Sequence, residues 1–103
     1  MSTSVFIIEQ FVAVERNSLR GFCRVRAPSG LIFHDVAVHQ RSGVAWASPA
    51  AKPMLDRNGQ QMRDAGGKAL WSPIISFSNR EARDRFSTAV VDAMRLAHPE
   101  ALA

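Results

Sequence analysis

The side chains best suited to metal chemistry in this chain are His34, Asp35 and His39. Imidazole and carboxylate groups are common metal ligands. In a regular strand, His34 and His39 project from opposite faces because their positions differ by an odd number. Asp35 and His39 share a face, but four residues at about 3.3 Å each separate them by roughly 13 Å. We therefore expect no metal site and no cofactor, and we expect Asp35 to make structural hydrogen bonds.

Cys23 is the only cysteine, so the chain cannot form an internal disulfide. A thiol becomes a nucleophile only beside a base or in an electropositive pocket. Cys23 alternates with Gly21 and Val25 on a strand face that we expect to be buried, where a lone thiol acts as a small hydrophobe. The chain has no CxxC motif or phosphate-binding loop, because Gly66-Gly67-Lys68 lacks the required spacing. We therefore expect that the protein is not an enzyme.

The sharpest functional pattern is an alternation of arginines around one aromatic residue. Arg20, Phe22, Arg24 and Arg26 fall on one face of a strand, and the small or apolar residues between them fall on the other. Guanidinium groups interleaved with an aromatic ring suit phosphates and stacked bases. The alternative is an ordinary exposed face, with Phe22 under a loop or in a dimer contact.

The elements that must position these residues are short strands. Runs rich in β-branched and aromatic residues, separated by turn residues, indicate strands over 5–16, 19–27, 31–39, 44–48 and 70–77. Tight turns between short strands favour antiparallel pairing of neighbours. We therefore predict an α+β fold in a single domain, residues 1–103. It comprises an antiparallel meander of about five strands, within 4–48 and 70–77, followed by one C-terminal helix.

Residues 49–69 differ from the rest in carrying prolines, glycines and basic residues, among them Lys52 and Arg63. We expect a long loop or a loose hairpin that turns at 56–59, and long loops in compact domains are commonly functional. Pro73 places the strand that follows at an edge or a bulge. We see no internal repeat.

The helix is expected over about 79–97. Ser78-Asn79-Arg80-Glu81 reads as a capping box, in which serine and glutamate side chains satisfy free N–H groups at the helix start. Phe86, Val90 and Met94 follow at a spacing of four and predict one apolar stripe facing the sheet.

The composition narrows the class of protein. The chain has 103 residues with a net charge of +4, and its 13 basic residues are mostly arginines, whose planar groups suit phosphates and carboxylates. No stretch resembles a signal peptide or approaches the roughly 18 apolar residues of a membrane span. We therefore expect a cytoplasmic protein with no membrane partner.

The motifs also follow a familiar order. Gly21-Phe22-Cys23-Arg24-Val25 precedes a turn and the run Leu31-Ile32-Phe33-His34-Asp35-Val36-Ala37-Val38, in which a His-Asp pair stands between apolar residues. After these come a turn at Gly43, Pro49, Lys52-Pro53, a turn at 56–59, Arg63-Asp64, Pro73 and the helix. This order resembles the SpoVG family of small bacterial regulators over most of the chain. The resemblance implies a sheet-plus-helix dimer that binds DNA, and in some members RNA, with Lys52 and Arg63 at its basic positions.

These patterns together lead to one expected function and one alternative. We expect a homodimer that binds nucleic acid, DNA or RNA, through Arg20, Phe22, Arg24, Arg26, Lys52 and Arg63, by phosphate neutralisation and base stacking. Apolar residues along 5–14 are expected to supply surface for the second copy. The alternative is a protein–protein adaptor, such as a phage- or plasmid-encoded accessory protein, whose basic face binds an acidic partner.

Overall fold

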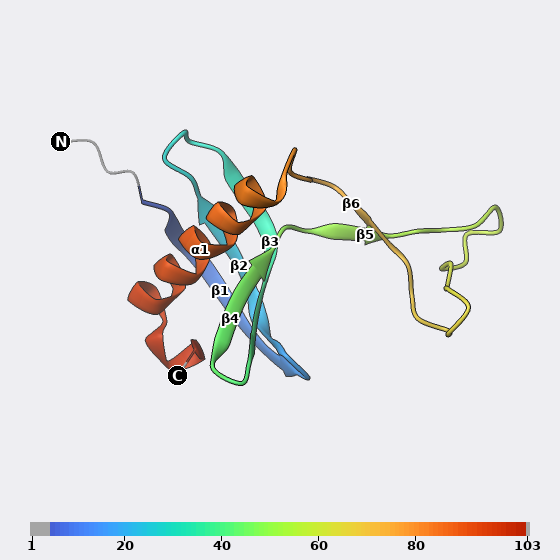
Figure 1. Ribbon diagram of the computed structural model, residues 1–103, viewed down its shortest axis with the longest axis horizontal. Helices are drawn as coiled ribbons and strands as arrows, with labels where there is room; N and C mark the ends of the chain where they lie inside the picture. Colours follow the sequence, from blue (N-terminus) through green and yellow to red (C-terminus); the bar gives the residue numbers. More distant parts are fainter. Residues whose placement is uncertain (1–4, 103) are drawn as a thin grey trace.

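The computed structural model describes residues 5–102 and shows a four-stranded sheet with one helix packed across it (Figure 1). The sheet is an antiparallel meander in the order β1 (Ile7–Arg16), β2 (Leu19–Arg26), β3 (Ile32–Arg41) and β4 (Val44–Ser48). Helix α1 (Arg80–Ala97) and the short 3-10 helix η1 (Pro99–Leu102) follow. The expected α+β fold is confirmed. Residue 4, the first position expected to hold a strand, lies outside the described residues.

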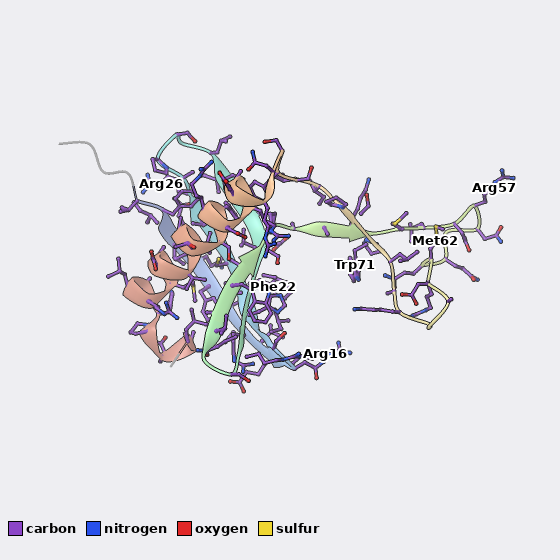
Figure 2. All side chains as sticks on the ribbon, in the orientation of Figure 1. Arg16, Phe22, Arg26, Arg57, Met62 and Trp71 are labelled. Carbon is purple, nitrogen blue, oxygen red and sulfur yellow. The ribbon has the colours of Figure 1, made fainter. Side chains whose placement is uncertain are left out.

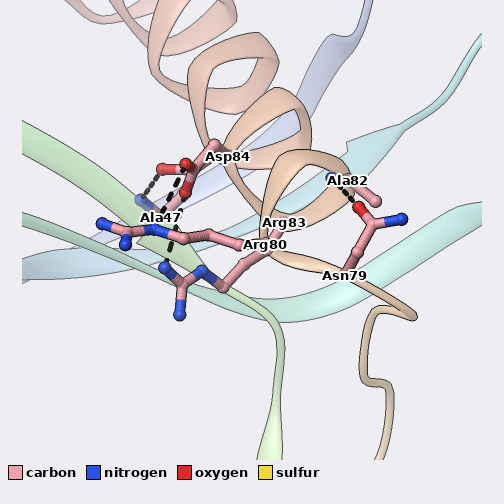
Figure 3. A network of polar contacts seen from close by, with 7 residues as sticks. Ala47, Asn79, Arg80, Ala82, Arg83 and Asp84 are labelled. Atoms are coloured by element: carbon pink, nitrogen blue, oxygen red, sulfur yellow. Dashed lines mark hydrogen bonds and ion pairs between the residues drawn. The ribbon is translucent and has the colours of Figure 1, made fainter.

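The expected fifth strand forms over fewer residues and pairs outside the meander. Strand β6 (Trp71–Pro73) joins β5 (Ala51–Pro53), which lies within the segment expected to be a loop, in a separate two-stranded sheet. The free edge of β4 is occupied instead by the helix, because the Ala47 N–H donates to Ser87 Oγ at 2.9 Å (Figure 3). This hydrogen bond satisfies a backbone N–H on the edge strand that would otherwise be free to pair with another strand.

The core lies between the sheet and α1. Val25, Val36 and Val38 are fully buried on the sheet side. Phe86, Val90 and Met94 are buried on the helix side, which confirms the predicted apolar stripe. Burying each apolar side chain of this size stabilises the fold by about 1.5–3 kcal/mol, relative to leaving it exposed.

The helix starts where the sequence predicts, but with a different cap. Asn79 is the N-cap, and its side chain accepts a hydrogen bond from the Ala82 N–H at 2.8 Å (Figure 3). The prediction of the cap at Ser78 is therefore wrong by one residue. Serine and asparagine are both preferred at this position, so residue type alone does not decide between them. Arg80 and Asp84 form an ion pair one turn apart, at 3.8 Å on the exposed face.

The molecule is elongated because residues 50–75, here called the arm, project from the body formed by the meander and α1. The principal extents are 52 × 28 × 24 Å, and Figure 1 shows the arm leaving the sheet on the side away from α1. The face of the sheet opposite α1, here called the open face, is left uncovered by the helix. Between residues 5 and 102, the structure contains no helix of the length and apolarity needed to span a membrane.

Candidate nucleic-acid interface

The open face is built around Phe22. The strand register sets Phe22 opposite Val12 of β1 and Ala37 of β3, so the aromatic ring stands between two smaller side chains. Phe22 is 38% exposed and Val12 is 53% exposed. With this exposed fraction, the Phe22 ring is accessible to a flat ligand such as a base.

A second aromatic site lies two residues along β3 from Ala37. The rings of His39 and Trp46 stack in parallel, with centroids 5.2 Å apart and planes 4° apart. His39 Nδ1 also lies 3.1 Å from the Ser18 hydroxyl, which fixes the imidazole. Burial and the nearby Arg20 guanidinium lower the pKa of His39 below its ordinary value of 6.5. Sequence reasoning did not assign His39 and Trp46 to this surface, although the alternation along β3 and β4 could have placed them there.

Arg20 stands at the same end of the sheet, beside the turn between β1 and β2. Its guanidinium donates to the carbonyl oxygens of Asn17 and Leu19, at 2.9 and 3.2 Å. Arg16 ends β1 and Arg41 ends β3, and antiparallel pairing brings both strand ends to this edge. Among residues 5–102, none of these three arginines takes part in an ion pair. This end of the open face therefore carries cations available to an anionic ligand.

Arg24 and Arg26 differ in that they share one carboxylate. Glu9 lies 3.7 Å from Arg24 Nε and 3.5 Å from Arg26 Nε. Glu9 occupies an irregularity in the β1–β2 ladder, between the pairs formed by Ile8 and Gln10, and so reaches the arginine side. The structure thus places Arg20, Phe22, Arg24 and Arg26 along one strand as predicted, with part of the charge of Arg24 and Arg26 neutralised. Figure 2 shows Arg26 toward the opposite end of the sheet from Arg16.

The two basic residues taken from the resemblance lie on the arm. Lys52 is exposed on β5 opposite Ser72. Arg63 donates to the carbonyl oxygen of Gly67 at 3.1 Å and also remains exposed. A ligand that touches both these residues and the open-face arginines has to cross the angle between the arm and the sheet.

The expected geometry of the histidines is wrong because β3 contains a bulge. Asp35 has a left-handed backbone (φ 55°), and the ladder slips between the pairs Cys23–Val36 and Val25–Phe33. The extra residue resets the alternation, so His34 and Asp35 both line a small open-face pocket of about 80 Å³ that Phe22 also borders. Within residues 5–102, no three His, Cys, Asp or Glu side chains converge in a way that would hold a metal ion.

Cys23 lies beneath this face and is 2% exposed. Burial raises the pKa of its thiol to about 12. The thiolate is therefore scarce near neutral pH, and since the thiolate is the reactive form, this group is poorly suited to nucleophilic chemistry.

Comparison of the chain with known protein families, with characterised proteins and with solved structures finds no match.

Proposed function

We propose that the protein is a nucleic-acid-binding regulator that holds DNA or RNA on the open face, without catalysis. The observation that carries this proposal is Phe22, an exposed aromatic ring on a sheet surface flanked by Arg20 and Arg24. Aromatic faces stack on bases of any sequence, and the arginines neutralise the phosphates beside them. The resemblance to the SpoVG family agrees with this function.

Charge distribution favours one end of the open face as the phosphate-binding end. The end that carries Arg16, Arg20 and Arg41 has no ion pair among the described residues, and it also holds the stacked His39 and Trp46. At the other end, Glu9 competes with phosphate for Arg24 and Arg26. We therefore infer that the phosphates bind at the end of the open face beside the turn between β1 and β2. A neighbouring base then stacks on Phe22.

The test is fluorescence anisotropy with labelled single-stranded DNA, duplex DNA and RNA at two salt concentrations. Phe22→Ala should weaken binding to single strands by about 10- to 100-fold, since stacking on one base contributes about 1–3 kcal/mol. The effect on duplex should be smaller because its bases are already stacked. Leu96→Ala is the matched control, since Leu96 is 83% exposed on α1, away from the open face.

The same assay separates the proposed function from the adaptor. Unlabelled DNA of unrelated sequence should compete with the labelled strand, because phosphate contacts carry no sequence information. If the folded protein binds none of the three nucleic acids at low salt, the proposal is wrong, and an acidic protein becomes the expected partner of the basic face.

A further inference from the structure

The arm is built from a short repeat that the sequence analysis missed. Asp56 and Asp64 each accept two backbone N–H groups on one carboxylate oxygen, at 2.8–3.0 Å, from the residues two and four positions later. Gly59 and Gly67 follow at the same offset of three with positive φ, 77° and 83°, a conformation that glycine adopts without strain. The arm therefore contains two equivalent turns eight residues apart.

The repeat closes into a ring of backbone hydrogen bonds. The Met62 N–H donates to the Met54 carbonyl at 2.7 Å, the Leu70 N–H donates to Met62 at 2.9 Å, and the Met54 N–H donates to Leu70 at 3.0 Å. Three chain segments are thus tied together through their main chains. This gives the arm a defined shape, although no arm residue is among the buried residues of the core.

One side of the arm is apolar over the part where β5 pairs with β6. The register pairs Ala51 with Pro73 and Pro53 with Trp71, and residues paired directly across a ladder point to the same side. Leu55 continues this side two residues beyond Pro53. Leu55 is 59% exposed and Trp71 is 56% exposed. We call Ala51, Pro53, Leu55, Trp71 and Pro73 the arm strip; Lys52 and Ser72 lie on the other side.

The chain exposes more surface than a compact monomer of its mass. A compact monomer of 11.3 kDa exposes about 5,700 Å², whereas this chain exposes 7397 Å². The five residues outside 5–102 can contribute at most about 800 Å² of the excess, from their mass and about 1.45 Å² per dalton. About 900 Å² remains, close to the roughly 800 Å² that each partner buries in a standard protein interface. The radius of gyration agrees, at 15.0 Å against about 13 Å for a compact domain of this length.

We propose that the arm strip is a dimerisation surface covered by a second copy of this chain. The five side chains of the strip are apolar, and an apolar protein surface suits them better than a phosphate backbone does. Gln61 and Arg63 lie on the same side farther along the arm, because they pair with Leu55 and Ala69. Pro53 and Pro73 lack N–H groups and oppose the addition of another strand to the arm, so the contact is made face to face. In a two-fold dimer the same patch meets on both subunits, and an apolar strip is complementary to itself. Figure 2 shows Trp71 near the base of the arm, where it is the largest anchor of the contact.

This assignment differs from the one expected from the sequence, which placed the dimer contact along residues 5–14. Strand β1 is an edge strand with exposed apolar residues such as Val12 and Val14, and so offers a competing surface. The arm strip shares no residue with the open face, and its test needs no nucleic acid, so the two proposals fail independently.

The experiment is sedimentation equilibrium of the full chain without nucleic acid. The wild type should be dimeric at tens of micromolar, and Leu55→Ser with Trp71→Ser should raise the dimer dissociation constant by on the order of 30-fold or more, the loss typical of an interface anchor. Leu96→Ser removes a still more exposed apolar side chain from α1 and should leave the constant unchanged.

A second variant removes the arm altogether. Ala50 and Ile74 are joined by a hydrogen bond of 3.4 Å from the Ile74 N–H, so two glycines can replace residues 51–73 while the sheet and α1 stay connected. This protein should be a monomer with the far-ultraviolet circular dichroism of a folded sheet and helix. A monomeric wild type overturns the proposal. Arm variants that dimerise as tightly as the wild type also overturn it and assign the contact to β1.

Discussion

Replacing Phe86 by alanine tests whether the packing of α1 on the sheet holds the fold together. Phe86 is 6% exposed, and its ring lies 5.2 Å from that of Phe33, 5.3 Å from that of Phe77 and 5.9 Å from that of Phe6. Removing a buried phenyl ring costs about 3–5 kcal/mol. Each aromatic pair adds about 0.5–1.5 kcal/mol beyond burial. We therefore expect the loss in unfolding free energy to lie toward the upper end of the range given for a buried phenyl ring. Since small proteins are stable by only about 5–15 kcal/mol, Phe86→Ala should remove a large part of the total.

Phe22→Ala is the matched control, because it deletes the same atoms from the other face of the sheet. Phe22 is 38% exposed and is paired across the ladder with Val12 and Ala37, so its loss should cost about 1 kcal/mol or less, the scale of a cross-strand pair. The assay is urea unfolding followed by circular dichroism at one fixed protein concentration, since dimerisation makes apparent stability depend on concentration. Equal losses in the two variants would refute the assignment of the core to the α1 side.

Further outcomes follow from individual groups. Cys23 should resist a thiol reagent near neutral pH in the native protein and react once urea unfolds it, since burial raises its pKa to about 12; rapid native reaction would contradict its burial. The pKa of His39 is lowered on folding, so the folded state binds fewer protons than the unfolded state below pH 6.5. The contribution of His39 to the unfolding free energy should therefore be fully present above pH 6.5. It should be lost as the pH falls from there through the pKa of His39 in the folded state. NMR titration should give a midpoint below 6.5, and His39→Gln should flatten that part of the stability curve. Gly21→Ala should lower the midpoint of thermal unfolding, because an added Cβ would collide with the Val12 carbonyl oxygen and lie 2.6 Å from the Phe11 ring; an unchanged midpoint would contradict this close approach of β1 to Gly21.

The parts of the fold that local signals determine were predictable from the sequence. The apolar stripe through Phe86, Val90 and Met94 places α1, because a period near 3.6 exposes one face of a helix. The turns between β1 and β4 likewise divide the meander correctly. The pairing of β6 with β5 was not predictable in this way, because the partner of a strand does not follow from its local residue types.

The candidate site was predictable where the strand is regular and failed where it is not. Alternation correctly sets Phe22 beside its neighbouring arginines. The bulge at Asp35 and the irregularity at Glu9 each shift the register, and neither follows from residue type alone. The ion pairs of Glu9 with Arg24 and Arg26 were therefore not predicted from the sequence. The arm repeat was visible in the eight-residue spacing of Asp56 and Asp64, which a search for repeats longer than about 20 residues overlooks.

The most direct test of the central claim is the salt dependence of affinity for a labelled single strand, measured for the wild type and three charge variants. Arg24→Ala should weaken binding and lower the log–log salt slope by up to about 0.7. Glu9→Gln should strengthen binding and steepen the slope, because it releases Arg24 and Arg26 for phosphate. Arg95→Ala removes the same charge from the exposed face of α1 and should change little. If Arg24→Ala and Arg95→Ala weaken binding equally and Glu9→Gln changes nothing, the open face is not the nucleic-acid interface.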